Sequence, residues 1–183
     1  MYNVPQTFGG VHTQRLWVDI GTIEKFLFAK WPATVIELGT GTGSFSVYLA
    51  VYCWFHDFSF HTFDTHKIRN SPFQERRDKC IEAIICLGGF CYTQDIFAKH
   101  TIDLIKDLVR SSRGPVFLYC DDGDKPREVC VYKGILRKGD FLGVHDYGAE
   151  IFESDLPMDS FVHIDERSFI ENGSSNRIME RVS

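Results

Sequence analysis

The residues with the clearest chemical meaning follow a short apolar run that ends at Glu37. A turn with glycine at every second position comes next, at Gly39, Gly41 and Gly43. Glycine has no Cβ and tolerates positive φ, so such a turn lets the backbone approach a nucleotide-like ligand closely. The spacing predicts a cofactor site that includes Thr40 together with the acid and the three glycines.

The spacing and charge of this turn also indicate the kind of cofactor. A dinucleotide-binding turn reads G-x-G-x-x-G/A, and here Ser44 stands at the last position because the third glycine comes one residue early. Glu37 disfavours a nearby diphosphate but complements a ligand that carries an ammonium and a sulfonium group. S-adenosylmethionine is such a ligand. The chain contains no G-x-x-x-x-G-K-[ST] pattern, so a P-loop nucleotide triphosphatase is not indicated.

Polar side chains also follow the next four predicted strands. They are Asp64, Gln94 with Asp95, Asp121 with Asp122, and His145 with Asp146. In open parallel sheets, ligands bind beyond the carboxyl ends of the strands. Capping of the following helix explains any one of these acids about equally well, but an acid after every strand indicates a site.

Individual roles follow from position. Asp64 follows Gly39 at close to the offset of about 20 residues at which an acid meets ribose hydroxyls, so we expect it on a cis-diol. Asp95 is expected to accept from an adenine amine, with the backbone of Ile96 completing the base edge. Lys125 is available to hold an anionic or sugar-like substrate, although a solvated helix start explains it equally well.

The elements that must position these residues alternate between strand and helix. Apolar spacing predicts helices over 14–30, over 44–56, from Ser71 to Gly88, around Ile105, and from Pro126 to near Gly139. Five strands precede or separate them, and two more are expected at 161–165 and 177–182. The predicted fold class is α/β, a Rossmann-like, doubly wound, mostly parallel seven-stranded sheet with helices on both faces.

Length and composition limit the function classes. With 183 residues we expect one domain over 1–183, divided into an N-terminal helical segment (1–30), a cofactor-binding core (31–150) and C-terminal strands (151–183). The net charge of −5 gives no reason to propose a nucleic-acid partner. We find neither a leader sequence nor an apolar stretch of about 18–20 residues, so we expect a cytoplasmic protein without membrane association.

Taken together, the glycine turn and the strand-end acids resemble class I S-adenosylmethionine-dependent methyltransferases. The segments 121–125 and 136–147 are similar to the group that contains macrocin O-methyltransferases and cephalosporin-hydroxylase-like proteins. The resemblance covers roughly residues 10–150. It implies a seven-stranded Rossmann-like fold, and it implies cofactor contacts at these positions: Glu37, Gly39, Thr40, Gly41, Gly43, Asp64, Gln94, Asp95, Ile96 and Asp121.

The resemblance also implies a site for the methyl acceptor. In that group, acids after the fourth and fifth strands bind a divalent metal that positions a hydroxyl, and the matching positions here are Asp122, or Asp121, with His145 and Asp146. His145 stands where an acid is common, and Mg²⁺ prefers oxygen ligands. Two alternatives to a metal ligand therefore stay open for His145, a general base and a histidine that is merely hydrogen-bonded at a strand end.

The favoured hypothesis is an enzyme that transfers a methyl group to a small hydroxylated acceptor such as a sugar or phenol, with catalytic roles for His145, Asp146, Asp122 and Lys125. S-adenosylmethionine is its expected cofactor, and Mg²⁺ or another divalent metal is the second. The alternatives are an S-adenosylmethionine-binding protein without methyl transfer and, less favoured, a nicotinamide-dependent oxidoreductase. The sequence leaves the oligomeric state open, a homo-oligomer included.

Overall fold

A single seven-stranded sheet organises the part of the chain that the computed structural model describes, residues 7–8, 11–12, 17–65 and 71–183. From one edge to the other, the strands are β5 (Phe90–Thr93), β4 (Ser59–Asp64), β3 (Thr34–Leu38), β6 (Val116–Cys120), β7 (Phe141–Val144), β9 (Arg177–Arg181) and β8 (Phe161–His163). The first five are parallel, whereas β9 pairs antiparallel with both β7 and β8. The predicted fold class is confirmed.

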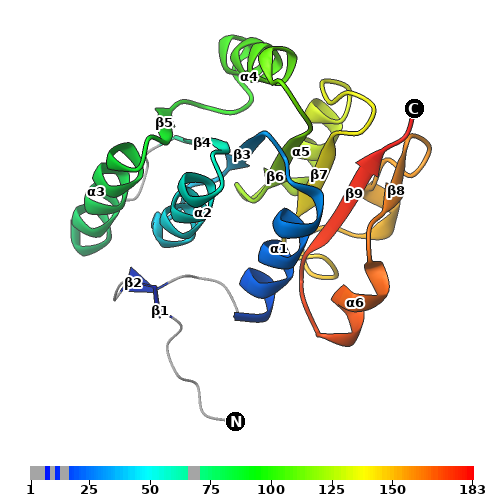
Figure 1. Cartoon of the computed structure of the whole chain (residues 1–183), viewed down its shortest axis with the longest axis horizontal. Coiled ribbons are helices and arrows are strands. Elements are labelled where there is room, and N and C mark those ends of the chain that lie inside the picture. Colours follow the sequence, from blue (N-terminus) through cyan, green and yellow to red (C-terminus); the bar gives the residue numbers. More distant parts are fainter. Residues whose placement is uncertain (1–6, 9–10, 13–16, 66–70) are drawn as a thin grey trace.

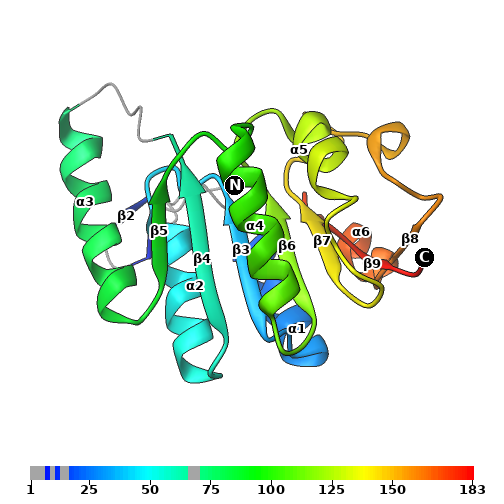
Figure 2. The ribbon, with the colours of Figure 1, turned by 90° about the horizontal axis from the view of Figure 1, so that it is seen from above.

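Helices cover both faces of this sheet (Figures 1 and 2). They are α1 (Trp17–Lys30), α2 (Ser44–Phe55), α3 (Ser71–Cys86) and α6 (Glu166–Glu171) on one face, and α4 (Lys99–Ser111) and α5 (Lys125–Tyr132) on the other. A two-stranded hairpin, β1 (Thr7–Phe8) and β2 (Val11–His12), and a 3-10 turn, η1 (Glu153–Asp155), complete the assignment. Within the described ranges, no helix is both long and apolar enough to cross a membrane.

The central strands are apolar along their whole length because both of their faces are covered. Along β3, Val35 packs in the cluster beneath α1 and α2, while the next residue, Ile36, packs in the cluster beneath α4 and α5. The same alternation holds in β6, where Phe117 and Leu118 face opposite clusters. Such continuous apolar strands are typical of a parallel sheet with two buried faces.

Two element boundaries differ from the prediction. The helix expected to continue to near Gly139 ends as α5 at Tyr132, and turns that include Gly134, a poor helix former, follow it. The segment between the last two strands contains α6, a short helix that buries Phe169 and that the sequence did not predict. The predicted helix over 14–30 is observed from Trp17 onward, and its first three positions lie outside the described residues.

The order of the strands creates a crevice at one place. β4 and β6 flank β3 on opposite sides, so the chain reverses its direction of travel across the sheet between them. At such a switch point the loops after neighbouring strands diverge to opposite faces and leave room for a ligand at the carboxyl ends. The loops after β3, β6 and β7 meet beside this point.

Candidate functional site

A cavity of about 280 Å³ lies beyond the carboxyl ends of β3, β6 and β7. It coincides with the switch point of the sheet, where α/β folds bind their ligands. Its lining includes these residues predicted from the sequence: Glu37, Gly39, Thr40, Gly41, Asp121, Asp122, Lys125, His145 and Asp146. Phe45 and Glu150 also line it, although neither was predicted.

The glycine turn packs directly against the loop that follows β6. Gly39 has a φ of 100°, and a Cβ there would lie 2.5 Å from the carbonyl oxygen of Asp121, a distance that real contacts do not reach. Gly43 also has a positive φ, of 87°, but its missing Cβ makes room for Cys80 on α3. Gly39 therefore shapes the cavity, whereas Gly43 allows α2 and α3 to pack closely.

Glu37 is a buried carboxylate at the base of the cavity, with 1% of its surface exposed. The hydroxyl groups of Ser46, in the first turn of α2, and Thr62, in β4, both donate to its Oε2 atom, at 2.5 and 2.6 Å. Hydrogen bonds of this kind stabilise the ionised form of a carboxyl group. The negative charge expected beside the turn is thus held in place by two neighbouring elements.

Asp64, at the end of β4, supports the same turn. Its Oδ2 atom accepts a hydrogen bond of 2.8 Å from the backbone N–H of Gly41 and lies 3.5 Å from a guanidinium nitrogen of Arg77. Arg77 comes from α3 and is itself 2% exposed. Asp64 stands beside the cavity rather than in its lining, and it connects the glycine turn to α3.

Asp95 and Ile96, predicted for the adenine, and Gln94, predicted as a further cofactor contact, lie outside the cavity lining. The Gln94 side chain accepts from Thr101 at 3.2 Å, and the carboxylate of Asp95 accepts from the backbone of Phe97 at 2.8 Å. Ile96 is buried, and its carbonyl accepts from the hydroxyl of Tyr132. These groups order the start of the segment that leads to α4.

Electrostatic coupling nevertheless connects Asp95 to the site. Burial, followed by the nearby charges of Asp64 and Asp95, raises the pKa of Asp122 to about 6. Asp122 lines the cavity, and its backbone N–H donates to the buried carboxylate of Glu128 at 3.2 Å. Asp64 and Asp95 therefore lie close enough to oppose the ionisation of Asp122, and this arrangement favours a cationic ligand.

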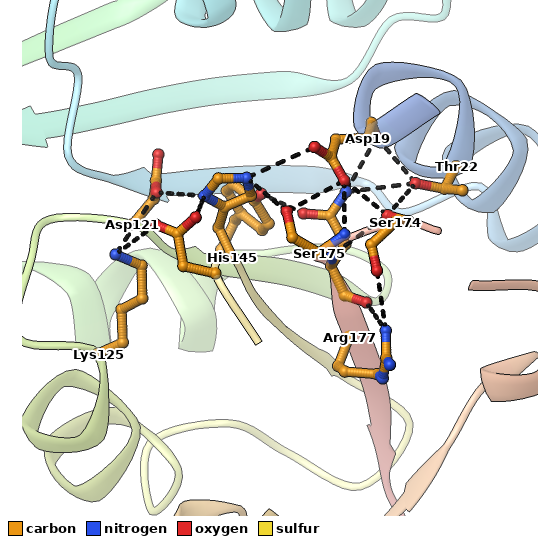
Figure 3. A network of polar contacts seen from close by, with 11 residues as sticks. Asp19, Thr22, Asp121, Lys125, His145, Ser174, Ser175 and Arg177 are labelled. Atoms are coloured by element: carbon orange, nitrogen blue, oxygen red, sulfur yellow. Dashed lines mark hydrogen bonds and ion pairs between the residues drawn. The ribbon is translucent and has the colours of Figure 1, made fainter. Parts of the chain in front are cut away.

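His145 lies at the centre of a chain of polar contacts that runs away from the cavity (Figure 3). Its Nδ1 atom is 2.9 Å from Asp146 and 3.4 Å from Asp121. On the far side of the ring, Nε2 is 2.9 Å from the hydroxyl of Ser175 and 3.7 Å from a carboxylate oxygen of Asp19. The imidazole is 5% exposed and is oriented from both sides.

Asp19 belongs to α1 and is buried, with 1% exposure. Its Oδ1 atom accepts from the Ser174 hydroxyl at 2.7 Å and from the Ser175 backbone at 2.8 Å. Burial alone raises the pKa of Asp19, but hydrogen bonds from His145 and the two serines outweigh it, so the net shift is downward. A carboxylate on the first helix thus anchors the segment that positions the histidine.

Lys125 is the first residue of α5, and its side chain is 3% exposed. Its ammonium group lies 2.6 Å from Glu150, 3.2 Å from Asp146 and 3.9 Å from Asp121. Burial raises the pKa of Asp146, but the charges of His145 and Lys125 outweigh it and the net shift is downward. Asp146 also adopts a left-handed backbone, with a φ of 56°, of the kind that aspartate tolerates better than most residues.

A divalent metal would need several oxygen or nitrogen ligands that converge on one point beside the cavity. Potential ligand atoms of Asp121, His145 and Asp146 all lie within 4.8 Å of one another, so Asp121 rather than Asp122 joins the other two. However, Nδ1 of His145 already lies 2.9 Å from a carboxylate oxygen of Asp146 and 3.4 Å from one of Asp121. The ammonium of Lys125 also contacts both acids. As arranged, the set does not fit a metal ion.

Sequence analysis missed several residues that hold the site in place: Asp19, Ser46, Thr62, Glu128, Glu150 and Ser175. Most act through contacts between elements, which periodicity does not reveal. Asp19 sits among apolar residues of α1 but reads as a favourable acid in a first helical turn. Thr62 gave a usable signal, because a polar side chain in the buried part of a strand needs a hydrogen-bond partner.

Comparisons with known proteins address the fold. No protein-family model and no curated protein sequence matches this chain. A structure of CmcI with Mg and S-adenosylmethionine (SAM) has a TM-score of 0.67 at 15% identity, covering 98% of this chain and 77% of that chain. A CmcI structure with S-adenosylhomocysteine (SAH) has a TM-score of 0.65 at 12% identity, covering 98% and 84%.

A third solved structure is more distant. A protein from Staphylococcus aureus assigned as a caffeoyl-CoA O-methyltransferase has a TM-score of 0.51 at 12% identity, covering 69% of this chain and 56% of that one. At these identities the likeness establishes the fold. This chain has the seven-stranded Rossmann-like fold of CmcI, as the resemblance in its sequence predicted.

Proposed function

We propose that this protein is a SAM-dependent methyltransferase acting on a hydroxyl group of a small molecule. The observation that carries the proposal is the charge of the cavity at the switch point. Five acids line it, namely Glu37, Asp121, Asp122, Asp146 and Glu150, against the one cation Lys125 among its described lining residues. A cavity with this excess of carboxylates complements the ammonium and sulfonium groups of SAM and disfavours the diphosphate of a nicotinamide cofactor.

The proposed cofactor contacts follow the geometry of the glycine turn. We assign Glu37, Gly39, Thr40 and Gly41 to the methionine part, because they line the cavity where the loop after β6 closes over β3. Asp64 is assigned to the ribose hydroxyls, since it stands at the end of the next strand and bonds Gly41. CmcI structures with SAM and SAH, which share this fold, support the choice of cofactor.

Asp95, Gln94 and Ile96 are proposed for the adenine end at the carboxyl end of β5. Their described groups already bond within the protein, so we expect the base to lie against this segment rather than to replace those bonds. Asp121 and Asp122 would border the cofactor from the loop after β6. The negative charge shared by Asp122, Asp64 and Asp95 supports a cationic ligand here.

When bound, SAM supplies an electrophilic methyl group on a sulfonium sulfur. An acceptor hydroxyl that took this methyl group would have to give up its proton to the protein or to solvent. We assign that proton to Asp146, whose side chain is 34% exposed and lines the cavity. His145, 2.9 Å from it, orients the carboxylate, and Lys125 stabilises the negative charge that develops on the acceptor oxygen.

A methyl-transfer assay tests this function. The protein is incubated with SAM labelled in its methyl group and a panel of sugars, phenols and other hydroxylated small molecules. Label should move to at least one acceptor class, and Asp146→Asn should lower turnover by about a hundredfold or more while leaving SAH affinity within about twofold. Unchanged turnover in Asp146→Asn would remove the assigned role of this carboxylate.

Titrations with SAH and with NAD, run beside the transfer assay, separate the proposal from the other classes. SAH binding without transfer to any acceptor would favour a cofactor-binding protein. Binding of NAD in place of SAH would favour an oxidoreductase. Both outcomes would contradict methyl transfer.

A further inference from the structure

We propose that the ammonium group of Lys125 takes the place of a divalent metal ion at the acceptor side of the cavity, so that the site works without bound metal. The inference rests on the proposed function and deepens it, because it names the group that neutralises the acids there. Its first support is position. Nζ of Lys125 contacts Asp146, Asp121 and Glu150 at 3.2, 3.9 and 2.6 Å, so acids from the loop after β6 and the loop after β7 surround it.

The second support is burial. The Lys125 side chain is 3% exposed, so it has no room to leave the acids for solvent without rearranging its surroundings. Its backbone is fixed as well, because it begins α5 next to Pro126 and follows Asp124, which caps the helix by accepting from the backbone of Arg127. The ammonium is therefore a resident cation of the site rather than a surface charge that happens to lie nearby.

The third support is the chemistry of the donors. A metal ion between Asp121 and Asp146 would lie within a few ångströms of a buried ammonium, and like charges repel strongly in such surroundings. Nδ1 of His145 is already engaged by the same two carboxylates, at 3.4 Å from Asp121 and 2.9 Å from Asp146. Glu150, which sequence analysis did not predict, completes the binding of the ammonium instead.

A lysine can also perform the task that a metal performs in such a site. Its ammonium neutralises Asp121 and Asp146 and presents N–H groups to an oxygen entering the cavity. As the acceptor loses its proton, the fixed positive charge stabilises the oxyanion without any change of coordination. Lys125 thus joins the cavity lining as a positioning and charge-stabilising group for the acceptor.

Metal titration tests the proposal without requiring turnover. The full chain is dialysed against a chelator and titrated with Mn²⁺, which accepts oxygen and nitrogen ligands. Wild type should bind Mn²⁺ with a dissociation constant of about 1 mM or weaker, and Lys125→Met should bind at least about tenfold more tightly, because the acids lose their resident cation. Lys138→Met, which removes an exposed lysine elsewhere, should match the wild type.

Micromolar Mn²⁺ binding that persists when Glu153→Gln removes an acid of the separate cluster of Glu153, His163 and Glu166 would overturn the proposal, as would a Lys125→Met variant that binds no more tightly than the wild type. If that variant does not fold, the wild type still decides. Its affinity for SAH should agree within about twofold in excess Mg²⁺ and in excess chelator, and a gain of about tenfold with Mg²⁺ would also overturn the inference. Failure of SAH to bind in either condition would contradict the proposed function. The Mn²⁺ titrations would still test whether the ammonium of Lys125 takes the place of a metal ion.

Discussion

At the scale of single residues, an acid at the end of a strand can have two roles, binding the ligand and supporting the fold. Asp64 illustrates both, because the role proposed for it is to bind the ribose, while its observed role is to hold the Gly41 N–H and the buried guanidinium of Arg77. Its removal would therefore disturb the fold as well as the ligand. A variant that keeps an acceptor oxygen separates the two effects better than alanine does.

Asp64→Asn should weaken SAH binding by about tenfold to about a hundredfold, because a charge-assisted hydrogen bond to the ribose is lost. Asp64→Ala should in addition destabilise the protein by about 3 kcal/mol, since it also removes the oxygen that accepts from the Gly41 N–H and faces the buried guanidinium of Arg77. The unfolding temperature without ligand reads the stability, and its shift on adding SAH reads the affinity. Asp78→Asn, an exposed acid on α3 beside Arg77, is the matched control. An SAH-induced shift in Asp64→Asn equal to that of the wild type would contradict the assignment of Asp64.

At the scale of elements, the sequence predicted the strands and most of the helices because their signals are local. Apolar runs of strand length and helical periodicity do not depend on distant partners. Two features of the structure could not be predicted from such local signals. The end of α5 at Tyr132 reflects turns around Gly134, and α6 is only six residues long, too short for its periodicity to be read.

The contact between the turn after β3 and the loop after β6 gives the element-scale prediction. Gly39→Ala would place a Cβ 2.5 Å from the Asp121 carbonyl, so we expect a loss of about 3 kcal/mol or more in the free energy of unfolding. Gly123 also has a positive φ, of 112°, but nothing lies within 4 Å of the position of a Cβ there. We therefore expect Gly123→Ala to lower the free energy of unfolding by only about 1–2 kcal/mol.

Urea unfolding of the two glycine variants measures the difference. Both variants place alanine at a positive φ, but only Gly39→Ala adds a clash between the two loops. A larger loss of unfolding free energy in Gly39→Ala than in Gly123→Ala therefore measures the cost of that clash. Equal losses in the two variants would mean that the loops can separate at little cost. The cavity would then be less firmly shaped than the distances indicate.

At the scale of the whole molecule, the candidate site joins the two ends of the chain. Asn176, just before β9, donates to the backbone carbonyl of Asp19, 157 positions away, at 3.0 Å and accepts from the hydroxyl of Tyr119 in β6 at 2.6 Å. Ser175 beside it reaches His145. Sequence reasoning found the strand-end acids but not this support, because no local pattern relates residues so far apart.

A buried acid also couples the stability of the whole molecule to pH. Burial is the largest cause that raises the pKa of Glu128 from 4.5 to about 7, although N–H groups of Asp122 and Asp124 donate to its carboxylate. Between these two pKa values the folded protein binds more protons at Glu128 than the unfolded chain does. This contribution to stability is therefore full below pH 4.5 and is lost as the pH rises through 7.

Glu128→Gln removes this titration while keeping a carbonyl acceptor. The fall in unfolding free energy between about pH 5 and about pH 8 should be smaller in the variant than in the wild type by about 2 kcal/mol. Asp122, whose pKa is raised to about 6, acts in the same direction and remains in both proteins. Urea unfolding at the two pH values gives the comparison, and identical pH dependence in the two proteins would rule out the burial cost assigned to Glu128.

The most direct test of the central claim, that the cavity at the switch point binds a SAM-type cofactor, is a calorimetric titration of the wild-type chain with SAH beside a parallel titration with NAD. We predict one SAH per chain in the micromolar range and no heat of binding with NAD, because the five acids of the cavity disfavour a diphosphate. Absence of SAH binding by a folded protein, or preference for NAD, would contradict the account.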